Sequence, residues 1–99
     1  MKHKVNISLQ LLPGSKTKDT YEIIDRAIEI IAASGIHYRV CPFETVMEGD
    51  YEEIMQLISK IHTECMEYGA ENILSFIKVQ ISKDKDVLIS DKTGKYDKA

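Results

Sequence analysis

Hydrophobic and polar side chains alternate at the start of this chain of 99 residues. The hydrophobic positions are Val5, Ile7, Leu9 and Leu11, and the polar positions between them are Asn6, Ser8 and Gln10. This period of two predicts a half-buried β-strand, with one face on a core and three hydrogen-bonding side chains on the other. A Pro-Gly pair at residues 13–14 ends it.

Two later segments have the periodicity of amphipathic helices. The first covers residues 19–34, with Asp19 as N-cap, Glu22 as its capping-box partner and Gly35 just past the end. The second begins at Asp50, with Glu53 in the capping-box place, and ends at Gly69. The hydrophobic stripes that we expect to be buried are Ile24, Ala27, Ile28 and Ile31 in the first helix, and Ile54, Leu57, Ile58, Ile61, Cys65 and Tyr68 in the second.

Three further strands are predicted, over residues 36–41, 44–48 and 72–82. Pro42 interrupts the first of them, which suggests an edge position or a bend. Residues 83–99 are polar apart from residues 87–89, which could form a short extra strand. Lysines and aspartates are interleaved in this C-terminal stretch, which we expect to be a solvated face or tail.

The element order β-α-β-β-α-β predicts an α+β fold, a ferredoxin-like sandwich in which two helices cover one face of a four-stranded antiparallel sheet. We expect a single domain over residues 1–99, with a core at about 4–82 and a polar C-terminal segment. The other sheet face is expected to show Asn6, Ser8, Gln10, Leu74, Phe76, Lys78 and Gln80. Such a partly apolar face predicts a homodimer or homotetramer packed through the sheet, or a bound ligand.

Composition excludes several classes of protein. A net charge of −3 argues against a nucleic-acid partner. No apolar signal core follows Met1 and no long apolar run occurs, so no membrane partner is expected and the location is expected to be cytoplasmic. Two cysteines without a Cys-x-x-Cys spacing are typical of reduced thiols in that compartment.

Catalytic and metal sites find little support. His62 and Cys65 share a helix face, but zinc needs three or four convergent ligands, so no metal and no cofactor is expected. The loop after the first strand has no second Gly before Lys16, which excludes a P-loop, and no Arg, which argues against acylphosphatase chemistry. Cys41 lies two residues from Arg39, and such a neighbourhood could lower the pKa of a thiol. We predict no enzymatic activity.

The most informative stretch is residues 43–51, where a short strand with a Thr and a Glu ends at Gly49 and a capped helix begins. Polar groups at a strand end beside a glycine turn can hold a small ligand, although a plain strand-to-helix turn has the same pattern. Glu44 and Glu48 fall on one face about 13 Å apart, too far for a retaining-type catalytic pair.

With the alternating first strand and the Thr-x-x-Glu-Gly step at residues 45–49, the sequence over about residues 4–82 resembles the small thiamine-binding (YkoF-like) family, whose short members were long left uncharacterised. The resemblance implies a ferredoxin-like fold, dimers that can pair into tetramers, and a carrier or sensor that binds thiamine or its hydroxymethylpyrimidine moiety. It assigns Thr45 and Glu48 to the ligand.

From the open strand face we add Ser8 and Gln10, and Phe43 could stack on a flat cationic ring. The alternatives left open are a regulatory domain that senses amino acids or nucleotides on the same fold, and a purely structural oligomeric module.

Overall fold

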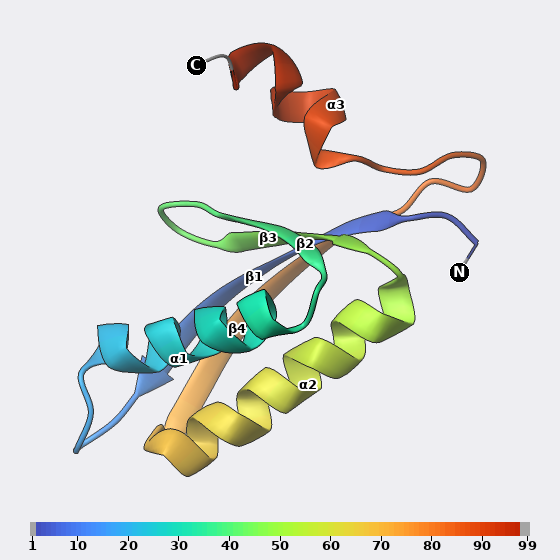
Figure 1. Cartoon of the computed structure of the whole chain (residues 1–99). Helices are drawn as coiled ribbons and strands as arrows, with labels where there is room; N and C mark the ends of the chain where they lie inside the picture. Colours follow the sequence, from blue (N-terminus) through green and yellow to red (C-terminus); the bar gives the residue numbers. More distant parts are fainter. Residues whose placement is uncertain (1, 98–99) are drawn as a thin grey trace.

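The computed structural model of the chain describes residues 2–97 and has four strands, two long helices and a short C-terminal helical turn (Figure 1). In chain order these are β1 (Val5–Gly14), α1 (Thr20–Ala33), β2 (His37–Val40), β3 (Thr45–Gly49), α2 (Tyr51–Tyr68), β4 (Asn72–Gln80), α3 (Ile89–Thr93) and a 3₁₀ turn, η1 (Gly94–Tyr96).

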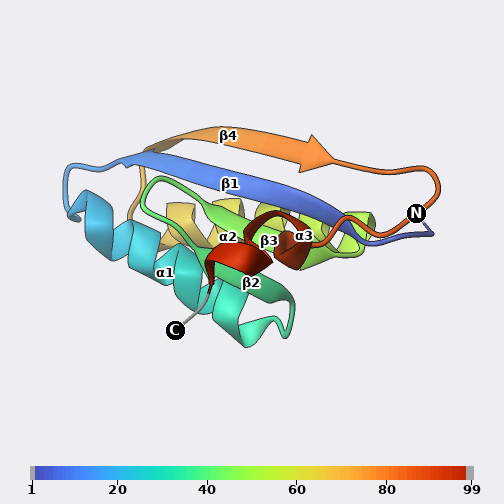
Figure 2. The same cartoon turned by 90° about the horizontal axis from the view of Figure 1, so that it is seen from above.

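The strands form one antiparallel sheet in the order β2-β3-β1-β4. Helices α1 and α2 both lie against one face of this sheet, while α3 lies on the opposite side (Figures 1 and 2). Four strands in this order with two crossover helices on one face are the ferredoxin-like arrangement. The predicted α+β ferredoxin-like sandwich is therefore confirmed.

The caps that the sequence predicts fix the helix ends. The Asp19 carboxylate accepts a hydrogen bond from the Tyr21 amide, and the Glu22 carboxylate accepts one from the Asp19 amide, so the capping box is complete. Asp50 accepts from the Glu53 amide over 3.0 Å, which caps α2 at its predicted start. The long helices end, as predicted, next to glycines with positive φ, Gly35 after α1 and Gly69 after α2.

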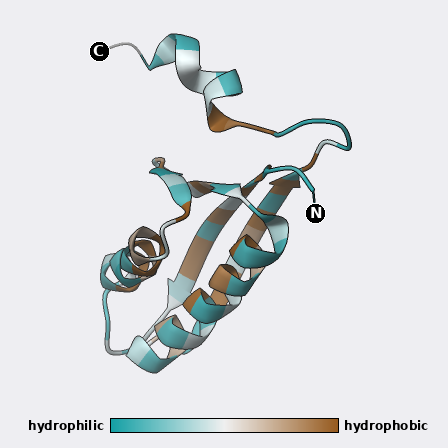
Figure 3. Cartoon of the chain, turned by 45° about the vertical axis from the view of Figure 1, so that its right-hand side comes forward, coloured by the Kyte–Doolittle hydropathy of each residue, from teal (hydrophilic) through white to brown (hydrophobic). Residues whose placement is uncertain are grey.

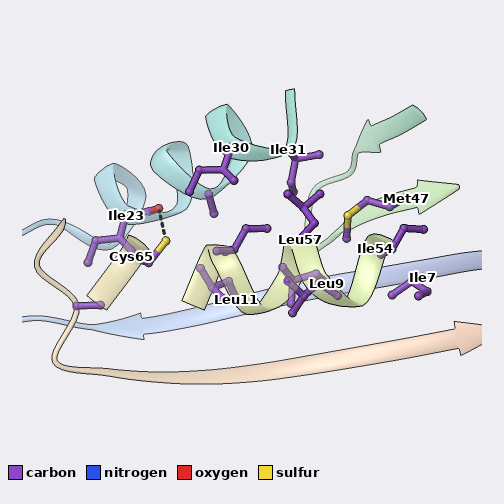
Figure 4. Packing of buried hydrophobic residues seen from close by; sticks show 14 of the residues in the cluster. Ile7, Leu9, Leu11, Ile23, Ile30, Ile31, Met47, Ile54, Leu57 and Cys65 are labelled. Carbon is purple, nitrogen blue, oxygen red and sulfur yellow. Dashed lines mark hydrogen bonds between the residues drawn. The ribbon is translucent and has the colours of Figure 1, made fainter. Parts of the chain in front are cut away.

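The core lies between the two long helices and the inner face of β1 and β3 (Figure 4). The predicted stripe of α2 is confirmed from Ile54 to Cys65, whose thiol points to the Ile23 carbonyl oxygen at 3.8 Å, but its last predicted member, Tyr68, is exposed. The stripe of α1 is shifted from the prediction, because the residues that are buried are Ile23, Ala27, Ile30 and Ile31. Ile24 and Ile28 are only half-buried.

The extra strand expected near residues 87–89 is wrong, whereas most of the lysines and aspartates around it are exposed, as expected of a solvated face; residues 98–99 lie outside the described residues. Val87 and Ile89 are buried, and Ile89 begins α3 instead of extending a strand. We call residues 83–97 the C-terminal segment; a hydrophobic stretch leads into α3 on the side of the sheet away from α1 and α2 (Figure 3). This segment covers part of the face that the sequence left open, because the apolar side chains of Val87 and Ile89, two positions apart, can dock on it together.

Candidate functional site

A cavity of about 320 Å³ lies between the outer face of the sheet and α3, and we call it the upper cavity. Its floor comes from β1, β3 and β4, and its roof comes from the C-terminal segment. The residues that define it include Asn6, Ser8, Arg39, Cys41, Glu44, Val46, Lys78, Ile89, Lys92 and Thr93.

Ser8 is the polar residue at the centre of this floor. Its register partners are Val46 on β3 and Lys78 on β4, and the residue is only 8% exposed. The Ser8 hydroxyl is buried and has no hydrogen-bond partner among the described residues. A buried group left in this state costs about 1–3 kcal/mol. A hydroxyl that faces a cavity without a partner is therefore free to bond to a ligand.

The Glu44 carboxylate stands beside Ser8 and accepts a hydrogen bond from Lys78 Nζ over 3.2 Å. The pKa of the Glu44 carboxyl is lowered, first by the nearby Ser8 hydroxyl and then by the Lys78 ammonium. The Ser8 hydroxyl is near enough to Glu44 to favour the ionised form of the carboxyl, yet Ser8 and Glu44 do not reach the geometry of a hydrogen bond. At neutral pH the cavity thus holds an ionised carboxylate next to an unpaired donor.

Asn6 is buried on the same strand face, but its amide group is already hydrogen-bonded within the protein. In the amide orientation that satisfies both groups, its nitrogen donates to the Val87 carbonyl oxygen over 2.8 Å and its oxygen accepts from Lys92 Nζ over 3.0 Å. Asn6 therefore holds the roof of the cavity in place.

Two further contacts fasten the C-terminal segment. Glu48 Oε1 accepts a hydrogen bond from the Ile89 amide over 2.6 Å, so the predicted ligand carboxylate holds α3 and does not line the upper cavity. Arg39 pairs with Asp97 and donates to Thr93 Oγ1 over 3.0 Å.

The remaining predicted residues lie elsewhere. Thr45 faces the helices, and with Phe43 it lines a second hollow of about 250 Å³ between α1 and the β2–β3 connection, which we call the lower cavity. Gln10 is half-buried opposite Phe76 and lines neither cavity. The structure therefore does not bring Ser8, Gln10, Phe43, Thr45 and Glu48 into one site.

Sequence reasoning placed Asn6 on the open face without naming it as a site residue, and it considered Glu44 only together with Glu48, as two carboxylates on one strand face. It also missed Lys92 and Thr93, because no local signal shows that the C-terminal segment folds back over the sheet. Among residues 2–97, no group of three or more His, Cys, Asp or Glu side chains is placed to hold a metal ion. No described helix is long and apolar enough to cross a membrane.

Comparison with known proteins agrees with this architecture. A UPF0045 protein of Clostridium perfringens is 36% identical over 91 residues, which cover 92% of this chain and 95% of the relative. A solved structure of a domain of unknown function, DUF77, from Bacillus cereus matches with a TM-score of 0.90 at 33% identity, covering 95% of this chain and 90% of that one.

A Thermotoga maritima structure, for which a role in thiamine biosynthesis or salvage has been suggested, matches with a TM-score of 0.85 at 30% identity. It covers 94% of this chain and 98% of that one. The family model described as "Thiamine-binding protein" matches residues 7–97, so it includes the C-terminal segment, about which the resemblance over residues 4–82 gave no information. The chain belongs to this thiamine-binding protein family.

Proposed function

We propose that the protein binds thiamine, or its hydroxymethylpyrimidine moiety, without chemical conversion, and that the pyrimidine ring occupies the upper cavity. One observation carries the proposal: the Ser8 hydroxyl is buried in this cavity with no partner among the described residues, beside a carboxylate whose pKa is lowered. The family to which the chain belongs supports the ligand class.

The chemistry of an aminopyrimidine matches these two groups. Its exocyclic amine can donate a hydrogen bond to the ionised Glu44 carboxylate. Its ring nitrogens can accept a hydrogen bond from the Ser8 hydroxyl. A hydrogen bond to a charged group contributes about 1.5–3 kcal/mol, and a neutral one about 0.5–1.5 kcal/mol. The cavity volume of about 320 Å³ is at the small end of ligand sites, which favours one enclosed ring with the rest of the molecule toward the opening.

A carrier or sensor fits the site better than an enzyme does. Nucleophilic catalysis needs a hydroxyl or thiol hydrogen-bonded to a base, and Ser8 makes no such bond among the described residues, even with the nearby Glu44 carboxylate. A Ser-His contact does occur, between Ser75 and His62 Nε2 at 2.7 Å, but neither residue lines the upper or the lower cavity. We further propose a cytoplasmic location, with which two free thiols, Cys41 and Cys65, are consistent.

We also propose that copies of the chain associate through β4. This strand is at an edge of the sheet and carries exposed hydrophobic side chains on both faces: Leu74, Phe76, Ile77 and Val79, followed by Ile81. A long apolar edge strand is a template for pairing with another strand, and pairing with a second copy would cover it. A homodimer joined at this edge, which can pair again into a tetramer, is the assembly we expect.

The proposal is tested by thermal-shift titration with thiamine, hydroxymethylpyrimidine, amino acids and nucleotides. A ligand at 100 times its dissociation constant should raise the unfolding free energy by about 2.7 kcal/mol, a clear upward shift for a domain of this size. We expect a shift with thiamine and with the pyrimidine. A shift only with amino acids or nucleotides, or none at millimolar concentration, would contradict the proposal.

A further inference from the structure

The lower cavity is separate from the site proposed above. It lies on the helix side of the sheet, between α1 and the connection from β2 to β3, and has a volume of about 250 Å³. Cys41 and Glu44 line both cavities, so the β2–β3 connection forms a wall between them. The interior of the lower cavity is mostly aliphatic, with Leu9, Leu11, Ile24 and Ile28 among its residues.

Two exposed aromatic side chains line this cavity. Tyr21, in the first turn of α1, is 73% exposed, and Phe43, in the β2–β3 connection, is 82% exposed. Single exposed aromatics are ordinary on a protein surface, but here two of them border the same apolar hollow. Aromatic rings in this position offer π-faces to a flat ligand.

The charge of the cavity has one sign. Asp25 and Glu44 are the charged residues that line it, and no lysine or arginine does, but Glu44 is already paired with Lys78 at 3.2 Å. Asp25 has no ion-pair partner in the described part of the chain, whereas Arg26 next to it is paired with Glu29 and Glu64. A ligand with a positive charge would therefore be attracted here, and an anion would be repelled.

Thr45 supplies a polar group at the base of the cavity. The residue is only 7% exposed, and its hydroxyl makes no hydrogen bond with any described residue. The Thr45 hydroxyl is not among the buried unpartnered atoms of the described residues, so it keeps contact with solvent in the cavity and is available to a ligand or to water.

We propose that the lower cavity is a second binding site, for a small flat organic cation that contacts the aromatic rings and is paired with Asp25. The site does not depend on the pyrimidine site above the sheet, and either could exist without the other. Since the cavity is slightly smaller than the usual range for drug-sized ligands, a one-ring cation such as a thiazolium or a pyridinium suits it best.

The test is an NMR titration of the full chain with the N-methylated thiazolium half of thiamine, which has no pyrimidine ring. We expect saturable shifts of amide signals around Asp25 and Thr45, and none with the neutral hydroxyethylthiazole at the same concentration. Phe43→Leu should weaken binding of the thiazolium roughly 2- to 5-fold, the range expected for loss of a cation–π contact at an exposed site. Asp25→Asn should weaken it as well.

Matched controls are available elsewhere on the surface. Tyr96, also 73% exposed, lies in η1, and Glu67 is exposed on α2; neither lines the lower cavity. Tyr96→Leu and Glu67→Gln should leave binding of the thiazolium unchanged. No saturable shift, equal binding of the neutral thiazole, or equal affinity in Phe43→Leu and Asp25→Asn would overturn the second site. Hydroxymethylpyrimidine, titrated separately, reports on the upper cavity, so the two proposals can fail independently.

Discussion

The amide of Ile89 donates a hydrogen bond to Glu48 Oε1 over 2.6 Å and joins the C-terminal segment to the sheet. Glu48 belongs to the Thr-x-x-Glu-Gly step that the sequence marks as a ligand site, yet its carboxylate is occupied by the protein's own backbone. Ile89 is itself a residue of the upper cavity. Under the proposed function, Glu48 would act on a ligand through the roof of the site, and we expect the docking of that roof to be coupled to the binding of ligand.

Replacing Glu48 should weaken the docking of the C-terminal segment on the sheet. Glu48→Ala leaves the Ile89 amide without its partner, and we expect a loss of about 1–3 kcal/mol in the docking of the segment. Glu48→Gln keeps an oxygen acceptor and is the matched control, with a smaller effect. Hydrogen exchange of the amides of residues 87–93 measures this directly. Unchanged protection in Glu48→Ala would show that the bond does not hold the segment.

Acidic pH should detach the C-terminal segment from the sheet. The pKa of Asp97 is lowered, first by its hydrogen bond from Arg39, and that of Asp86 is lowered, first by the Lys4 amide. A carboxyl whose pKa is lower in the docked state stabilises docking above its ordinary pKa of about 3.9, and this contribution is lost as the pH falls through the lowered value.

We therefore expect NMR signals of residues 87–97 to keep their docked positions from pH 7 to about 4 and to shift toward disordered positions below it. Asp97→Asn cannot ionise and should flatten part of this dependence while weakening docking at neutral pH. A transition centred at pH 6, or none down to pH 2, would contradict the assignment to these carboxyls.

Ser8→Ala should be an unusually mild substitution for a buried position. Its hydroxyl has no partner among the described residues, so its removal costs no hydrogen bond, and we expect equal or slightly higher stability. Asn6→Ala is the contrasting variant on the same strand face. It removes contacts to Val87 and Lys92 and should lower the unfolding free energy by about 1–3 kcal/mol. Urea unfolding measures both, and a large loss in Ser8→Ala would mean that the hydroxyl is bonded within the protein.

The β4 edge should determine the oligomeric state. A charge at its centre, as in Phe76→Glu, is expected to reduce the molar mass from light scattering to that of the monomer, because two buried carboxylates would face one another across a symmetric pair. Tyr96→Glu places the same charge on an exposed aromatic position in η1 and should leave the mass unchanged. A wild-type protein that is monomeric at high micromolar concentration would contradict association through this edge.

The sequence predicted the parts of the fold whose signals are local. The period of two in β1 places Ser8 on the outer face, and the cap at Asp19 sets the start of α1. The same period shows that Thr45 and Glu48, three residues apart on one strand, face opposite sides, so they could not share one cavity. The alternation along the strand was enough to predict that Thr45 and Glu48 face opposite sides, whereas the family resemblance assigned both residues to one ligand site.

The C-terminal segment could not be predicted in this way. Residues 87–89 have the composition of a short strand. Contacts with residues far away in the sequence determine where they lie. The Lys4 amide donates to Asp86 Oδ1, and the Val87 amide donates to the Lys4 carbonyl oxygen. Because no period or cap encodes such long-range contacts, the roof of the cavity, with Lys92 and Thr93, appears only in the structure.

The most direct test of the central claim is a calorimetric titration of hydroxymethylpyrimidine into the wild-type protein and into Ser8→Ala. The account predicts saturable binding to the wild type and an affinity lower by about three- to tenfold in the variant, as for the loss of one hydrogen bond. Urea unfolding should show that the variant is at least as stable as the wild type. Equal affinity of the two proteins, or no binding to the wild type, would contradict the placement of the ligand on Ser8.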